Sequence, residues 1–167
     1  MQSHKHVKHK SFSPEKFLEP KFEPEIFFRL SKKPHREMSD IDLIACCESF
    51  GIGVELVQSI YKGWTFKLPD TVAGFGLHGQ YKILEEMPIP SDENNRVVVI
   101  NQLKNFNLTL KKNSKIMEHG KSKNILEESP LAALRSYIEF CEKNLDWLVL
   151  NGPITTGTIT DAYDINK

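Results

Sequence analysis

Three glutamates are the residues of this chain most able to carry chemistry. Glu23 and Glu25 flank Pro24 in the stretch EPEIFF, and Glu55 lies in the apolar stretch GVELV. If EPEIFF is a strand, the side chains at i and i+2 share a face and the two carboxylates converge. Neighbouring carboxylates repel, and a divalent cation relieves the repulsion by accepting oxygen atoms from both.

Glu55 is the third candidate ligand, because a lone charge in an apolar strand is costly unless it is paired. Mg²⁺ suits an all-oxygen ligand set. Spacing alone also allows a simpler interpretation, since E-x-E occurs often on solvated strand faces, and that interpretation is the commoner one. The sequence therefore offers a metal site at Glu23, Glu25 and Glu55 as a hypothesis.

The elements that must position these residues are predicted from hydrophobic periodicity. Strands are expected at 22–30, 54–61, 81–89 and 96–103, a hairpin at 106–120 and a last strand at 151–159. One helix is expected over 41–52, ended by Gly51 and Gly53. A longer helix begins at Pro130, and its apolar residues recur at helical spacing: Leu131, Leu134, Ile138, Cys141 and Leu145. This pattern predicts an α+β fold with a mixed or antiparallel sheet and two helices.

Composition narrows the class of protein. The chain has 167 residues, and its 22 basic residues equal its 22 acidic ones, which argues against a nucleic-acid partner. No apolar run approaches the ~18 residues of a membrane span, and no secretory signal is evident. Three cysteines, two of them adjacent, make a poor disulfide framework, so a cytoplasmic location is expected. Residues 1–20 are predicted to be a mobile basic tail, and residues 21–167 a single domain.

Four segments together resemble a known family. EPEIFF, GVELVQSIYKGWTFKLPDTVA, NILEESPLAALRSYIEF and TTGTIT occur in the order seen in the 2-keto-4-pentenoate hydratases and 4-oxalocrotonate decarboxylases of the fumarylacetoacetate hydrolase superfamily. The resemblance covers residues 17–167. It implies a mixed, largely antiparallel β-roll of the fumarylacetoacetate hydrolase C-terminal type. It also implies that Glu23, Glu25 and Glu55 hold Mg²⁺ or Mn²⁺.

The same resemblance implies an activity. Such a protein would be a metal-dependent lyase of the hydratase type in aromatic catabolism, acting on a small unsaturated 2-oxo acid through a metal-stabilised enolate. Residues placed for substrate binding are Asn124 and the T-G-T stretch, Thr156, Gly157 and Thr158. An ordinary turn at Asn124 and an ordinary strand at 156–158 are the alternative interpretations.

The departures from the family pattern bear on proton transfer. Gly74 stands where the family has an aspartate, so the expected proton-transfer carboxylate is missing. His78 lies nearby, and a histidine side chain can transfer protons at physiological pH, whereas Lys67 could steady a substrate carboxylate. Both are candidate catalytic residues, although an ordinary pocket or surface group is the commoner interpretation of each.

The chain also looks shorter than family members at both ends. A catalytically impaired relative that binds a metal, a 2-oxo acid or a partner subunit is therefore the alternative function. A homo-oligomer, or pairing with a related subunit, is expected.

Overall fold

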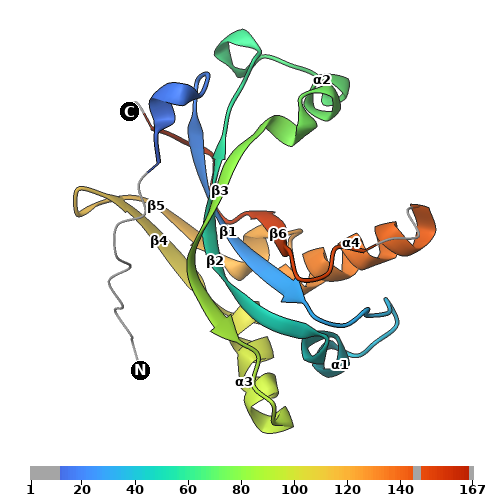
Figure 1. Cartoon of the computed structure of the whole chain (residues 1–167). Helices are drawn as coiled ribbons and strands as arrows, with labels where there is room; N and C mark the ends of the chain where they lie inside the picture. Colours follow the sequence, from blue (N-terminus) through green and yellow to red (C-terminus); the bar gives the residue numbers. More distant parts are fainter. Residues whose placement is uncertain (1–11, 145–147, 166–167) are drawn as a thin grey trace.

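An antiparallel five-stranded sheet organises the molecule (Figure 1). The computed structural model describes residues 12–144 and 148–165. In the sheet β3 (His78–Pro88) pairs with β2 (Cys47–Val57), β2 pairs with β1 (Lys21–Leu30), and β1 pairs with β6 (Pro153–Thr158). The short strand β7 (Tyr163–Asp164) also pairs with β1. Strand β1 is therefore held on both sides.

The alternation of β1 separates an apolar face from an acidic one. The even-numbered residues Ile26, Phe28 and Leu30 belong to the hydrophobic core, whereas Glu23 and Glu25 are odd-numbered and point the other way. Three helices cover the apolar face (Figure 1): α1 (Asp40–Ala45), α3 (Glu93–Lys104) and α4 (Pro130–Asn144). Their buried side chains complete the core, among them Leu43, Ile44, Val99, Ile100, Leu131, Leu134 and Ile138.

Pro24 is tolerated in this central strand for a local reason. A proline donates no backbone hydrogen bond and is usually confined to edges or irregularities of a sheet. β1 pairs with β7 at Lys21 and Phe22 and with β6 from Glu25 onward, so Pro24 lies where its neighbour changes. There its carbonyl accepts a hydrogen bond from the backbone N–H of Ile159 (2.9 Å).

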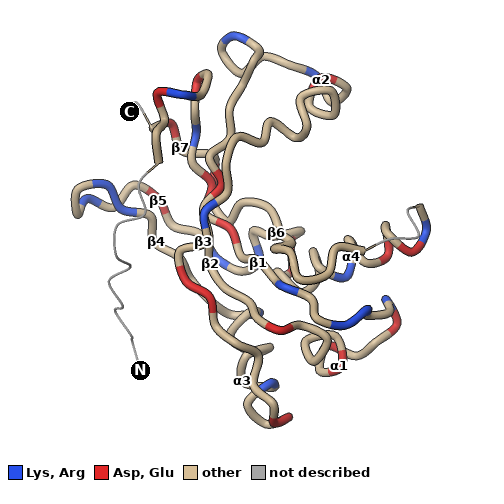
Figure 2. Tube along the Cα trace, viewed as in Figure 1, with Lys and Arg blue, Asp and Glu red and all other residues tan. Residues whose placement is uncertain are grey.

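The remaining elements lie outside this sheet. The hairpin of β4 (Asn107–Lys112) and β5 (Lys115–Lys121) forms its own two-stranded sheet, and Figure 2 shows the lysine-rich end of the hairpin. An arm carries α2 (Leu68–Ala73) between the 3₁₀ turns Lys62–Trp64 and Phe75–Leu77, and it lies apart from α1, α3 and α4 (Figure 1). Further 3₁₀ turns span Pro14–Lys16 and Ser122–Asn124.

The helix expected over 41–52 is wrong in its second half. Helix α1 ends at Ala45 and β2 begins at Cys47. Gly51 and Gly53 lie inside β2 and end no helix. A Cβ at Gly51 would lie 2.0 Å from the carbonyl oxygen of Glu85, and one at Gly53 would lie 2.2 Å from the hydroxyl of Tyr81. Both glycines therefore serve close packing between strands and not helix termination.

The strand expected over 96–103 is also wrong, because this segment is helix α3. Asp92 caps the helix by accepting a hydrogen bond from the N–H of Asn95 (2.9 Å). Val99, Ile100 and Leu103 are buried against the other helices and the sheet. The structure thus contains four α-helices in its described residues, where two were expected. The α+β class and the antiparallel sheet are confirmed.

Two expectations fall partly outside the described residues. Residues 1–11 of the expected tail, with its histidines, are not among them, and neither is Leu145. Residues 12–20 contact the domain, since the ring of Phe12 packs edge-on against Phe22 (6.1 Å between centroids). No helix in the described ranges is long and apolar enough to cross a membrane.

Candidate metal centre

The register of β1 and β2 brings the three glutamates together. Glu23 is the direct partner of Glu55 across the two strands, and Glu25 is the partner of Gly53. One carboxylate oxygen from each of Glu23, Glu25 and Glu55 lies within 4.8 Å of the others. The convergence expected from the i, i+2 spacing and the third acid is therefore present.

The environment of Glu23 and Glu25 opposes the ionisation of their carboxyl groups. Burial, followed by the charge of Glu55, raises the pKa of Glu25 to about 8. The same two causes raise the pKa of Glu23 to about 7, and the nearby Lys21 acts in the opposite direction. Glu25 is only 2% exposed, and its Oε2 has no hydrogen-bond partner among the described residues. Without a cation, the site holds its negative charge at a cost.

The donor set fits a hard divalent cation. It consists of carboxylate oxygens, the ligands that Mg²⁺ and Mn²⁺ prefer. The unpartnered Oε2 of Glu25 is an acceptor with no donor, which is what a cation would satisfy. Lys21 is close enough to Glu23 to act against its raised pKa, but its ammonium lies over the ring of Trp64, 4.1 Å from the centroid.

His78 is placed beside this cluster. It is the first residue of β3, and its Nδ1 contacts Oε1 of Glu55. The imidazole is about half exposed, so it can exchange protons with solvent. The structure thus brings one of the two candidate catalytic residues to the carboxylates.

Lys67 and Gly74 lie on the α2 arm. Lys67 is exposed and precedes α2, where its backbone N–H donates to Oδ2 of Asp70 (2.8 Å). Within 12–144 and 148–165 no contact joins Lys67 to the three glutamates. Gly74 ends α2, and a Cβ there would lie 3.1 Å from the side chain of Leu77. The structure therefore gives neither residue a contact with the acidic cluster.

The T-G-T stretch lies on β6, next to β1. Thr158 is the cross-strand partner of Glu25, but its hydroxyl donates to the carbonyl of Thr160 (2.7 Å). The hydroxyl of Thr156 donates to the carbonyl of Ile26 (3.0 Å), and Gly157 has a φ of +85°. These hydroxyl protons bond to the backbone, which leaves their oxygen lone pairs available.

Asn124 braces the same region. Its side-chain amide donates to the carbonyl of Ile159, just beyond β6 (2.8 Å). This hydrogen bond links the 3₁₀ turn Ser122–Asn124 to the residue that follows β6, as expected for a residue with a structural role in a turn.

The sequence interpretation missed two residues that touch the glutamates. The hydroxyl of Thr155 hydrogen-bonds Glu25 and works against its raised pKa. Tyr81, on β3, is the partner of Glu55, and its hydroxyl is shielded from solvent without a partner among the described residues. Burial, then the charges of Glu25 and Glu55, raises the pKa of this phenol. Its proximity depends on the β2–β3 register, which sequence spacing does not reveal.

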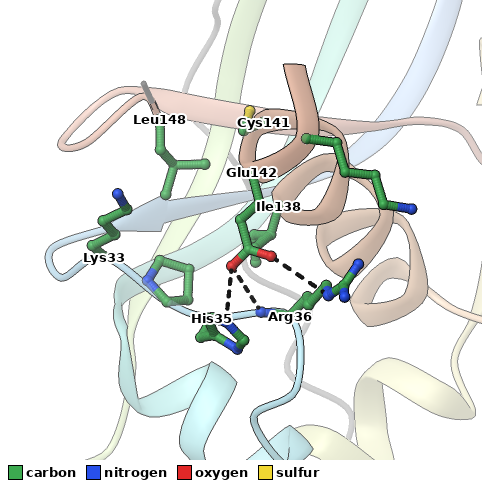
Figure 3. Close-up of a pocket in the computed structure, with 9 residues that line it drawn as sticks. Lys33, His35, Arg36, Ile138, Cys141, Glu142 and Leu148 are labelled. Carbon is green, nitrogen blue, oxygen red and sulfur yellow. Dashed lines mark hydrogen bonds and ion pairs between the residues drawn. The ribbon is translucent and has the colours of Figure 1, made fainter. Parts of the chain in front are cut away.

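A separate hollow of about 700 Å³ lies between the 33–36 segment and α4 (Figure 3). Glu142 accepts a hydrogen bond from the backbone N–H of Arg36 (3.2 Å) and lies 3.8 Å from the side chains of both Arg36 and His35. The glutamate carboxylate is therefore already paired with the basic groups drawn around it. None of the residues that line this hollow belongs to the acidic cluster.

The chain is similar to 4-oxalocrotonate decarboxylases in fold and, over a short stretch, in sequence. No family model matches the chain. A stretch of 57 residues is 30% identical to a 4-oxalocrotonate decarboxylase of Pseudomonas sp. This stretch makes up 34% of this chain and 22% of that protein. The fold is that of the 4-oxalocrotonate decarboxylase from Pseudomonas putida G7, solved in complex with magnesium and adipate, with a TM-score of 0.72 and 19% identity. A second structure, with calcium and acetate, gives a TM-score of 0.68 and 18% identity.

The coverage of these matches is unequal. The chain is covered to 91% in both structural comparisons, but it spans only 55% and 54% of the solved chains. The resemblance to the hydratase and decarboxylase group is thus confirmed in the fold and, over one stretch, in the sequence. The chain corresponds to about half the length of the proteins it resembles.

Proposed function

We propose that this chain binds Mg²⁺ or Mn²⁺ through Glu23, Glu25 and Glu55 and acts as a lyase of the hydratase type on a small unsaturated 2-oxo acid. The observation that carries the proposal is the approach of three carboxylates to within 4.8 Å around an unpartnered, buried Oε2 of Glu25. The magnesium and calcium complexes of the structurally similar decarboxylase support a divalent cation.

Each residue around the proposed metal site has its own proposed role. A bound Mg²⁺ supplies Lewis-acid stabilisation of the negative charge that develops as a 2-oxo acid becomes an enolate. Glu23, Glu25 and Glu55 hold the cation, and Phe27, which is fully buried on the same face, excludes water from one side. His78 holds a proton at the rim beside Glu55 and is the proposed general acid.

The neighbouring strand would contact the organic part of the ligand. Thr158 is paired with Glu25 across β1 and β6, so Gly157 and Thr158 are proposed to line the substrate side of the cation. In the described residues neither Lys67 nor Asn124 has a contact with the three glutamates, so a direct role for either would require a ligand that extends well beyond the cation. We also propose that the chain assembles with itself or with a related subunit, as the resemblance implies.

One observation favours a second function. The family's aspartate is replaced by Gly74, and no side chain of the α2 arm contacts the three glutamates in the described residues. A protein that binds the metal and a 2-oxo acid without turnover is the alternative. In that case the glutamates would bind metal normally, and addition of substrate would give binding heat without product.

The test has two stages. Calorimetric titration with MgCl₂ and MnCl₂ should show that the wild type binds the metal and that Glu25→Gln does not. The control variant is Glu48→Gln, which should bind the metal as tightly as the wild type, because Glu48 is an exposed glutamate of the same strand as Glu55. The absorbance of 2-hydroxypenta-2,4-dienoate is then followed with Mn²⁺ present. Absence of metal binding in the wild type would refute the proposal, and binding without turnover would establish the alternative.

A further inference from the structure

Tyr81 occupies an unusual place beside the glutamates. Its Cα is paired with that of Glu55, and its ring lies over Gly53, where a Cβ would come within 2.2 Å of the phenol oxygen. The ring also packs edge-on against Phe27, with 6.3 Å between centroids. Because Gly53 is itself the partner of Glu25, the phenol extends from β3 across β2 toward β1 and the carboxylate of Glu25.

Two buried polar atoms in this region have no hydrogen-bond partner among the described residues. The hydroxyl of Tyr81 and Oε2 of Glu25 are both shielded from solvent, and neither has a hydrogen bond in the described part of the chain. A buried hydroxyl left unpaired is costly, and phenylalanine would fill the same space over Gly53 without that cost. The phenol can donate a hydrogen bond and the carboxylate oxygen can accept one, yet no hydrogen bond joins the two atoms in the described part of the chain.

A cation alone satisfies only one of them. It would be bound by Oε2 of Glu25, but the phenol O–H of Tyr81 would still have no acceptor. We infer that Tyr81 binds the organic ligand directly, by donating a hydrogen bond from its hydroxyl to an oxygen of the anion that lies beside the cation. This inference rests on the proposed metal site and adds a specificity residue to it: the ligand must present an oxygen acceptor on the β2–β3 side, as a carboxylate or 2-oxo group does.

The experiment compares two matched tyrosine substitutions. Tyr81→Phe removes the hydroxyl in question. Tyr163→Phe is the control, because the Tyr163 hydroxyl is also buried and unpartnered in the described residues, but Tyr163 is paired with Phe22, on the opposite face of β1 from the glutamates. Each protein is titrated by calorimetry first with MgCl₂ and then, when loaded with Mg²⁺, with oxalate as the probe anion.

The expected result separates the two ligands. Tyr81→Phe should bind Mg²⁺ within about twofold of the wild type and oxalate about tenfold more weakly, the usual effect of one hydrogen bond to a charged group. Tyr163→Phe should match the wild type in both titrations. Oxalate should also perturb the near-ultraviolet absorption of the wild type in a way that Tyr81→Phe lacks, a signature that a purely structural role would not give.

The remaining outcomes of these titrations would refute either the metal site or the role of Tyr81. If the wild type binds no Mg²⁺, the proposed metal site and this inference both fail at the first titration. If Mg²⁺ binds and Tyr81→Phe retains full oxalate affinity, or the loaded wild type takes no oxalate, the metal site stands and the role of Tyr81 is refuted. An equal loss of Mg²⁺ and oxalate affinity in Tyr81→Phe would also refute it, because the hydroxyl would then act on the glutamates. Melting temperatures without metal check folding, and Tyr81→Phe should melt no lower than the wild type.

Discussion

Glu23 and Glu55 face each other as direct cross-strand partners in β1 and β2. Like charges in that relation destabilise a sheet, and here Glu25 adds a third carboxylate within 4.8 Å. The fold nevertheless buries this arrangement on a central strand. The stability of the protein should therefore depend on whatever neutralises these three groups, and the following predictions use that dependence.

Replacing Glu25 by glutamine should stabilise the metal-free protein at alkaline pH. The change removes one buried negative charge at nearly constant shape, and we expect a gain of about 1–3 kcal/mol in the free energy of unfolding at pH 8.5. For a chain of this size that is roughly 2–10 °C in melting temperature. At pH 5 the gain should nearly vanish, because Glu25, with a pKa of about 8, is already protonated in the native state. A variant less stable than the wild type at pH 8.5 would contradict this account.

The metal-free protein should lose stability as the pH rises from 4.5 to 8. The carboxyls of Glu23 and Glu25 release their protons near pH 4.5 when unfolded, but only near pH 7 and 8 when native. In that window the native state holds more protons, so stability falls with pH and levels off above pH 8. We expect a fall of about 2–4 kcal/mol, reduced by the partial exposure of Glu23. Urea unfolding at several pH values in EDTA measures it.

Saturating Mg²⁺ should flatten or reverse this trend, because the cation binds only the ionised carboxylates of the native state. The same unfolding series with Mg²⁺ is the comparison. A metal effect that is equal at pH 5 and pH 8.5 would show that the ion binds elsewhere.

His78→Gln should separate catalysis from metal binding. If His78 is the general acid, kcat should fall about 10²–10⁴-fold while the affinity for Mg²⁺ changes little, since three carboxylates remain. His119→Gln is the control: that imidazole lies on β5, where its Nδ1 is 3.3 Å from the hydroxyl of Thr109. Unchanged kcat in His78→Gln would remove His78 from the mechanism.

Alanine at Gly51 should destabilise the protein more than alanine at Gly53. The new Cβ at Gly51 would meet a backbone carbonyl, that of Glu85, at 2.0 Å, so β2 and β3 would have to separate. At Gly53 it would meet the hydroxyl end of Tyr81, which can move. We expect losses of about 2–4 and 1–2 kcal/mol respectively, measured by urea unfolding. The reverse order would mean that the Tyr81 ring is held more rigidly than the strand pair.

Local sequence patterns predicted what depends on near neighbours. The aromatic and β-branched residues over 22–30 predicted β1, and the i, i+2 spacing predicted the common face of Glu23 and Glu25. The helical spacing after Pro130 predicted α4. The hairpin expected over 106–120 is also present as β4 and β5, and Asn113 and Ser114 between the two strands have positive φ. In these segments propensity and tertiary packing agree.

The errors arose where tertiary packing overrides local propensity. The valines of 97–99 favour a strand, yet the Asp92 cap and the burial of Val99, Ile100 and Leu103 against the core make the segment a helix. The glycines of β2 resemble a helix stop until the neighbouring strand is known. Tyr81 could not be assigned to the site for the same reason, since its place depends on the β2–β3 register.

The alternating faces of β1 also limit how this protein can change over evolutionary time. Because β1 is paired on both sides, inserting or deleting one residue within it would reverse the faces of the residues on one side of the change. Such a change would either turn Glu23 and Glu25 toward the helices, which removes the site, or bring Phe28 and Leu30 onto the acidic face, which disrupts the core. Descendants of this chain can therefore lose or alter the carboxylates by substitution while they keep the fold, but length changes are confined to the segments that lie outside the paired strands.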